Sequence, residues 1–224
     1  MKGKSGLWRS HRCSHWRWLG VFYGSSSIRL WDTIAADLES PGIVNRGFGG
    51  STLEACGHFF ERLVAPLRPR SLIVYAGDND LGDGRSAEQV SGYFQELFTK
   101  VDLHLGPIPF GFISIKPSPA RFGIIGSIAR ANAEVRARMA SRPNSYYIDV
   151  FEPMLDRHRR PRVDLFLADG LHLSRAGYLI WTEQLLPFRK RLFIEQQSDS
   201  NTFVLRSEER EARVSQVAQQ PAEP

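Results

Sequence analysis

Long apolar runs are missing from this chain of 224 residues. A membrane-spanning helix needs about 18 to 20 consecutive apolar residues, and no segment comes near that length. We therefore expect no membrane span. Hydrophobic residues make up 42% of the chain and charged residues 24%, which excludes a wholly disordered or fibrous protein and predicts a globular one.

Cysteine is scarce as well. Cys13 and Cys56 are far apart in the sequence, so neither a disulfide framework nor a Cys-x-x-Cys metal site is predicted. Cys13 alternates with His11 and His15, but a metal site needs a fourth ligand, and none is in view. We expect neither a metal nor an organic cofactor.

The body of the chain lacks a net charge. Five of the 29 lysines and arginines lie in residues 1–18, and the other 24 balance the 24 acidic residues. Nucleic acid needs basic residues clustered on the fold, so we expect no nucleic-acid partner. Residues 1–18 are expected to be a flexible leader that resembles the front of a secretion signal. Its apolar core is short and cleavage would remove candidate catalytic residues, so we expect a cytoplasmic location.

Short apolar runs alternate with helical patterns between about residues 19 and 195, with no internal repeat. Five runs predict strands and five segments predict helices: strands at 19–23, 43–44, 72–76, 110–115 and 146–150, and helices at 28–38, 52–65, 86–103, 126–141 and from 174, which Pro187 should end or kink. Strands separated by helices indicate a five-stranded parallel sheet covered on both faces, a three-layer α/β/α sandwich of flavodoxin-like type. A polar tail is expected over 196–224.

Polar and glycine-rich clusters follow three of these strands, and a fourth precedes the last helix: Gly24-Ser25-Ser26-Ser27, Gly47-Phe48-Gly49-Gly50, Gly77-Asp78-Asn79-Asp80 and Asp169-Gly170-Leu171-His172. In open α/β sheets, ligands bind beyond the carboxyl ends of the strands. The clusters supply a hydroxyl, hydrogen-bond donors, an imidazole and a carboxylate, which are the parts of a serine hydrolase. No Gly-x-Ser-x-Gly elbow occurs, which argues against an ordinary α/β-hydrolase.

In these four blocks the chain resembles the SGNH or GDSL-like hydrolase superfamily, over about residues 19–186. The family's first block, Gly-Asp-Ser, corresponds to Gly24-Ser25-Ser26 here, and the glycine of its second block corresponds to Gly50. The third block, Gly-x-Asn-Asp, matches at Asn79, and the last block, Asp-x-x-His, matches at Asp169 and His172. Ser25 replaces the usual aspartate. Because three serines are consecutive, Ser25 and Ser27 remain alternative nucleophiles to Ser26.

The resemblance implies a role for each matched residue. His172 would take a proton from the nucleophile Ser26 and return it to the leaving alcohol, while Asp169 orients the imidazole. The backbone N–H groups of Ser26 and Gly50 and the side-chain amide of Asn79 would form the oxyanion hole. Taken singly, each residue also fits a plain structural role, a helix cap, a turn or a surface histidine.

We expect a serine esterase that acts on small-molecule esters with short acyl chains, acetyl-carbohydrates among them. Sheet and helices account for nearly the whole core, which leaves no long insertion for a lid or a lipid tunnel. The alternatives are an acyltransferase using the same site and a non-catalytic carbohydrate- or partner-binding module. Residues 157–162 are either a solvated loop or a rim that attracts anions, and Phe122 belongs either to an acyl pocket or to the core. The sequence predicts no oligomeric state.

Overall fold

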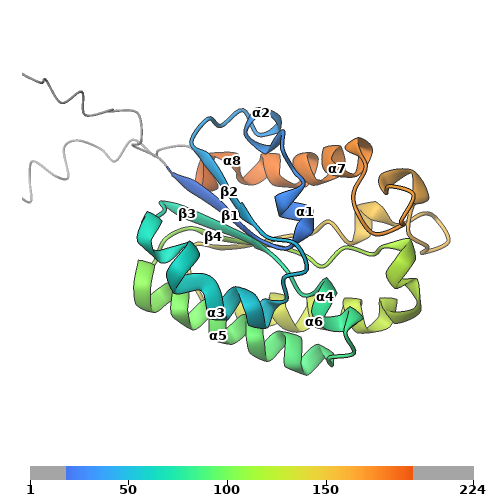
Figure 1. Cartoon of the computed structure of the whole chain (residues 1–224), viewed down its shortest axis with the longest axis horizontal. Coiled ribbons are helices and arrows are strands. Elements are labelled where there is room, and N and C mark those ends of the chain that lie inside the picture. Colours follow the sequence, from blue (N-terminus) through green and yellow to red (C-terminus); the bar gives the residue numbers. More distant parts are fainter. Residues whose placement is uncertain (1–18, 194–224) are drawn as a thin grey trace, which may run out of the picture. The chain divides into compact units, whose positions relative to one another are not determined.

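The computed structural model describes residues 19–193 (Figure 1). The predicted leader, with His11, Cys13 and His15, and the predicted tail at 196–224 lie outside the described residues. No helix among residues 19–193 is long and apolar enough to cross a membrane.

Five parallel strands form one sheet in the order β2-β1-β3-β4-β5. They are β1 Gly20–Gly24, β2 Ile43–Gly47, β3 Ser71–Tyr75, β4 Phe110–Ile113 and β5 Ser145–Ile148. β1 and β3 are buried along their whole length, which explains why they are continuous apolar runs rather than alternating ones. The strand order reverses between β1 and β3, so the carboxyl ends of these two strands flank the crevice where such sheets bind ligands.

Helices cover both faces of the sheet (Figure 1). One face carries α3 Leu53–Leu63, α5 Ala87–Leu105 and α6 Ile125–Met139, and the other carries α1 Ser26–Arg29, α2 Ile34–Asp37, α7 Arg175–Leu185 and α8 Arg189–Leu192. The short α4, Asp78–Gly82, follows β3. Residues 19–193 also hold five 3-10 segments: η1 Ala65–Leu67, η2 Pro119–Ile124, η3 Glu152–Met154, η4 Val163–Leu165 and η5 Leu186–Phe188. The predicted three-layer α/β/α sandwich is confirmed.

Local sequence signals set several of the helix boundaries. Ser86 and Gln89 form the predicted capping box ahead of α5, with bonds of 3.2 and 2.9 Å between each side chain and the other's backbone N–H. Ser174 caps α7 in the predicted place. Pro187 lies in η5, which interrupts the helical pattern between α7 and α8.

The helix predicted at 28–38 is wrong, because the segment forms two separate turns, α1 and α2. The Asn45 amide on β2 donates to the Ile28 carbonyl at 2.6 Å and approaches the Trp31 carbonyl at 3.4 Å. A continuous helix would offer the Ile28 carbonyl to the N–H four residues on. The Asn45 side chain, distant in sequence, therefore occupies the Ile28 carbonyl that a continuous helix would use as an acceptor. α4 is an element that the sequence pattern did not predict.

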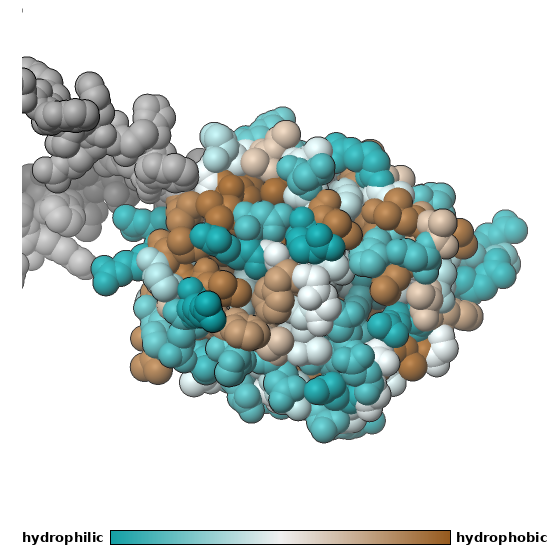
Figure 2. Space-filling model, viewed as in Figure 1, coloured by the Kyte–Doolittle hydropathy of each residue, from teal (hydrophilic) through white to brown (hydrophobic). Residues whose placement is uncertain are grey.

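Residues 151–167, the longest stretch expected to be irregular, hold η3, η4 and a β-bridge between Leu155 and Pro161, and Phe166 forms a second bridge with Leu173. The tip of this segment projects at the right of Figure 1, and Figure 2 shows hydrophilic residues there. The segment follows β5, so it lies at the same edge of the sheet as the predicted site.

Candidate active site

Three side chains from distant parts of the chain meet at the carboxyl edge of the sheet. Ser26 Oγ lies 3.1 Å from Nε2 of His172, and Nδ1 of the same ring lies 2.6 Å from Oδ2 of Asp169. The serine begins α1, while the other two lie in the turn before α7. One imidazole therefore bridges a hydroxyl and a carboxylate, which is the contact order of a nucleophile, a base and an orienting group.

The backbone at the end of β1 buries Ser25 and Ser27 and leaves Ser26 beside His172. Gly24 has φ +138°, and a Cβ built on it would lie 1.8 Å from the Tyr75 carbonyl oxygen, so only glycine fits there. The next residue, Ser25, donates its N–H to that carbonyl at 2.9 Å and is 3% exposed. Ser27 is 1% exposed, whereas Ser26 is only half-buried and contacts His172.

A tight turn fixes the carboxylate beside the imidazole. Oδ1 of Asp169 accepts the backbone N–H groups of Leu171 and His172, both at 2.9 Å. Gly170 has φ +64° and makes the turn possible. The hydrogen bond from the His172 ring, followed by the two backbone bonds, lowers the pKa of Asp169 to about 2. The carboxylate is therefore ionised under every ordinary condition and favours the imidazole proton on Nδ1, which leaves Nε2 to accept from Ser26.

The structure brings one predicted oxyanion donor, Asn79, to the loop that holds another, Gly50. Asn79 Nδ2 donates to the Ser51 carbonyl at 3.0 Å, which holds α4 against the loop after β2. Gly50 precedes that carbonyl, has φ +71° and has no atom within 4 Å of a Cβ built on it, so the space beside this glycine is open. Ser26 is the first residue of α1, and a helix cannot pair the N–H of its first residue internally.

The Asn45-Arg46-Gly47 segment positions this loop, a role that the motif comparison did not reveal. A Cβ on Gly47 would lie 2.3 Å from the backbone nitrogen of Arg29, so β2 approaches α1 too closely for any side chain. Asn45 Oδ1 accepts the Gly47 N–H at 2.9 Å while its amide binds the backbone of α1. These contacts fix the end of β2, and with it the Gly49-Gly50 turn, relative to the nucleophile.

A buried ion pair lies beneath Asn79, and sequence reasoning missed it. Lys116, 2% exposed, donates to Oδ2 of Asp78, 4% exposed, and the Tyr75 hydroxyl donates to the same oxygen at 3.1 Å. Burial opposes ionisation of Asp78, but the charge of Lys116 and the two hydrogen bonds hold its pKa below the ordinary value. Burial raises the pKa of Tyr75. The lysine comes from the loop after β4, a position where sequence alone favours a solvated side chain.

The carboxylate on the other side of Asn79 is buried too. Both oxygens of Asp80 accept the backbone N–H of Leu53, at 2.8 and 3.1 Å, at the start of α3. Burial raises the pKa of this group. α4 is thus joined to the loop after β4 by one acidic side chain and to α3 by the other. Asn79 lies between Asp78 and Asp80 in α4, so buried contacts on both sides hold the short helix that carries its amide.

The arginine-rich run at 157–162 is largely neutralised by neighbouring carboxylates. Arg159 pairs with Glu152, Arg160 with Asp156 at 3.3 Å, and Arg162 with Asp164 at 2.9 Å. This pairing favours the solvated-loop interpretation over an open cationic rim. Phe122 is 44% exposed, which excludes the core role among its two alternatives.

A serine, a histidine and an aspartate are in contact at the edge of the sheet. This arrangement is the one that serine hydrolases have as a class. Residues 18–180 match the GDSL-like lipase/acylhydrolase family, and the chain belongs to this family. A search of curated proteins gave no match.

Solved structures agree on the fold. A GDSL-like lipase from Bacteroides thetaiotaomicron has a TM-score of 0.65 at 20% identity, covering 76% of this chain and 86% of its own. An acetyl xylan esterase has a TM-score of 0.63 at 18% identity, with 75% and 98% covered. An acetyl esterase mutant crystallised with an acetate ion has a TM-score of 0.59 at 15% identity, with 75% and 95% covered.

Proposed function

We propose that this protein is a serine esterase that hydrolyses small-molecule esters with short acyl chains through an acyl-enzyme. The observation that carries the proposal is the pair of contacts on His172, 3.1 Å to the Ser26 hydroxyl and 2.6 Å to the Asp169 carboxylate. Family membership supports ester chemistry.

In the first half of the reaction, His172 Nε2 removes the hydroxyl proton as Ser26 Oγ attacks the ester carbonyl. The resulting oxyanion accepts hydrogen bonds from the N–H groups of Ser26 and Gly50 and from the Asn79 amide. Asn79 Nδ2 carries two hydrogens, so one can remain on the Ser51 carbonyl while the other points to the oxyanion. The intermediate collapses when the protonated imidazole gives its proton to the leaving alcohol.

In the second half, His172 removes a proton from water, which attacks the acyl-enzyme carbonyl. The same donors hold the second oxyanion. The imidazolium then returns its proton to Ser26 Oγ, and the carboxylic acid leaves. Asp169 stays ionised throughout and stabilises the imidazolium in both halves. Besides the ester and water, each step uses only side chains and backbone of this chain, so the proposal invokes no metal or organic cofactor.

The acyl chain in this proposal is short, and acetyl esters of carbohydrates are the favoured class. The helices of residues 19–193 pack on the sheet, and the segment nearest the site is rich in paired arginines rather than apolar residues. A long chain needs continuous apolar wall, worth about 0.8 kcal/mol for each buried methylene. The names of two similar structures, an acetyl xylan esterase and an acetyl esterase, support acetyl as the acyl group.

The test is a panel of p-nitrophenyl esters from acetyl to palmitoyl, run on the wild type and on Ser26→Ala. We expect kcat/KM to be highest at acetyl or butyryl and to fall beyond about hexanoyl. Ser26→Ala should lose activity on every ester. Residual activity of Ser26→Ala equal to the wild type would refute the mechanism, and a steady rise through decanoyl below micelle formation would refute the short chain.

A further inference from the structure

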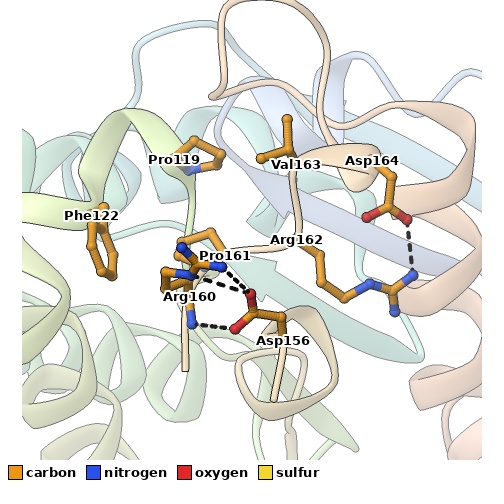
Figure 3. Close-up of a pocket in the computed structure, with 8 residues that line it drawn as sticks. All are labelled: Pro119, Phe122, Asp156, Arg160, Pro161, Arg162, Val163 and Asp164. Atoms are coloured by element: carbon orange, nitrogen blue, oxygen red, sulfur yellow. Dashed lines mark hydrogen bonds and ion pairs between the residues drawn. The ribbon is translucent and has the colours of Figure 1, made fainter. Parts of the chain in front are cut away.

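A pocket of about 470 Å³ lies beside the turn that carries Asp169 and His172 (Figure 3). Pro119, in its wall, contacts this turn: the Ala120 N–H donates to the Gly170 carbonyl at 3.0 Å, and Pro119 Cβ would lie 3.2 Å from a Cβ on that glycine. The pocket is within the size range of small-ligand sites, about 300 to 1,000 Å³. It therefore adjoins the turn that carries Asp169 and His172.

The walls of this pocket combine four apolar residues, one of them aromatic, with two ion pairs. Phe122 stands on one side, and the Arg160–Asp156 and Arg162–Asp164 pairs stand across from it (Figure 3). The ring is 44% exposed, so part of its face is open to a ligand. Two arginines and two aspartates give the lining no net charge.

This lining selects a neutral ligand that has hydroxyl groups and an apolar face. Each guanidinium has five N–H donors and a carboxylate has about four acceptor sites. Asp156 already accepts four hydrogen bonds, two from backbone N–H groups and two from Arg160, whereas Asp164 accepts one from Arg162. The remaining arginine donors and the acceptor sites of Asp164 are therefore available to hydroxyls. An anion would have to compete with the aspartates for the arginines. A long alkyl chain would leave the ion pairs desolvated without partners. A sugar ring satisfies both walls, because its C–H face can pack on an aromatic ring.

The position of the pocket identifies which part of the substrate it binds. In the proposed mechanism His172 protonates the leaving alcohol, so the alcohol departs on the imidazole side, whereas Gly50 and Asn79 hold the oxyanion from the loops after β2 and β3. We propose that the pocket is the leaving-group subsite, that it binds the sugar of an acetylated carbohydrate, and that Phe122 is the stacking residue. This inference rests on the proposed esterase function for the direction of the reaction.

Two acetyl esters that differ only in the alcohol test the subsite. The alcohol of ethyl acetate has only two carbons, while a monoacetylated methyl β-glucopyranoside offers a sugar ring to Phe122. We expect Phe122→Ala to raise KM and lower kcat/KM about tenfold for the sugar ester, with ethyl acetate changed less than about twofold. Phe122→Tyr should restore most of the loss. Arg160→Ala should act as Phe122→Ala does, whereas the exposed Arg130→Ala, which breaks an ion pair between α5 and α6, should change neither substrate.

A binding measurement separates this inference from the proposed function. Methyl β-glucopyranoside, which carries no ester, is titrated into Ser26→Ala and into Ser26→Ala/Phe122→Ala, with binding followed by NMR. We expect weaker binding by the double variant even if no ester is a substrate. An equal loss of activity on both acetates in Phe122→Ala would overturn the sugar subsite. So would a loss of activity that grows with the length of the acyl chain. Tighter binding of the anionic methyl glucuronide than of the neutral methyl glucoside would overturn it as well.

Discussion

Replacing Lys116 by methionine removes the cation from the buried pair beneath Asn79. Methionine keeps much of the volume of the lysine stem, so the substitution leaves the Asp78 carboxylate, 4% exposed, without its charged partner. Loss of one partner of a buried ion pair costs about 3 to 5 kcal/mol. A domain is stable by only about 5 to 15 kcal/mol, so the variant should unfold at a markedly lower urea concentration.

A double-mutant cycle assigns that loss to the pair. Asp78→Asn alone leaves the ammonium buried and unpaired, while Lys116→Met/Asp78→Asn leaves no buried charge and keeps an acceptor for the Tyr75 hydroxyl. We expect each single variant to lose about 3 to 5 kcal/mol and the double variant to lose no more than the larger single loss. Urea unfolding followed by tryptophan fluorescence measures all four proteins, because Trp31 and Trp181 are fully buried.

An exposed pair provides the matched control. Lys100 lies 3.0 Å from Glu61 on the surface, so Lys100→Met should cost less than about 1 kcal/mol. The stability from the lowered pKa of Asp78 is present above the carboxyl's unfolded pKa, about 3.9, and is lost as pH falls through the lower folded value. Lys116→Met should therefore flatten the acid side of the stability profile. A loss below 1 kcal/mol for Lys116→Met, or losses that simply add in the double variant, would refute the reasoning.

Three further predictions concern the proposed chemistry. Asn79→Ala should lower kcat by about 10² to 10³ with little change in KM, because the amide acts on the transition state, and near-normal kcat would reduce Asn79 to a structural role. An organophosphonate probe should add a single adduct on Ser26, detected by peptide mass spectrometry, and an adduct on Ser25 or Ser27 would reassign the nucleophile. Because the mechanism needs a neutral imidazole, kcat/KM should fall on the acid side of its pH profile, whereas Asp169, with a pKa of about 2, should add no limb there. A profile flat from about pH 5 to 9 would exclude histidine.

The sheet could be predicted from sequence because its strands have a local signal. A parallel strand buried on both faces must be an apolar run, and the connecting helices repeat every 3.6 residues. The capping box at Ser86 and Gln89 is equally local, since all its partners lie within four residues. The break between α1 and α2 has no such signal. It depends on the Asn45 side chain, which donates from β2 to the Ile28 carbonyl in α1.

The same distinction divides the candidate site. The four sequence blocks pointed to Ser26, His172 and Asp169 because carboxyl ends of parallel strands share one edge of a sheet. The choice among three consecutive serines needed burial, which no sequence pattern gives. Lys116 is the clearest omission: a lysine next to a proline reads as a solvated loop residue, and only the fold brings Asp78 and Tyr75 to it.

The buried carboxylates on both sides of Asn79 have a common physical consequence. A side-chain amide stabilises an oxyanion best when it is already oriented, because reorientation during the reaction would cost part of the stabilisation. α4 has only five residues, too few to be stable alone. Asp78 joins it to Lys116 and Asp80 joins it to the start of α3, so the short helix takes its rigidity from tertiary contacts. A loss of stability in this cluster should therefore lower kcat before it abolishes folding, since the amide loses its orientation first.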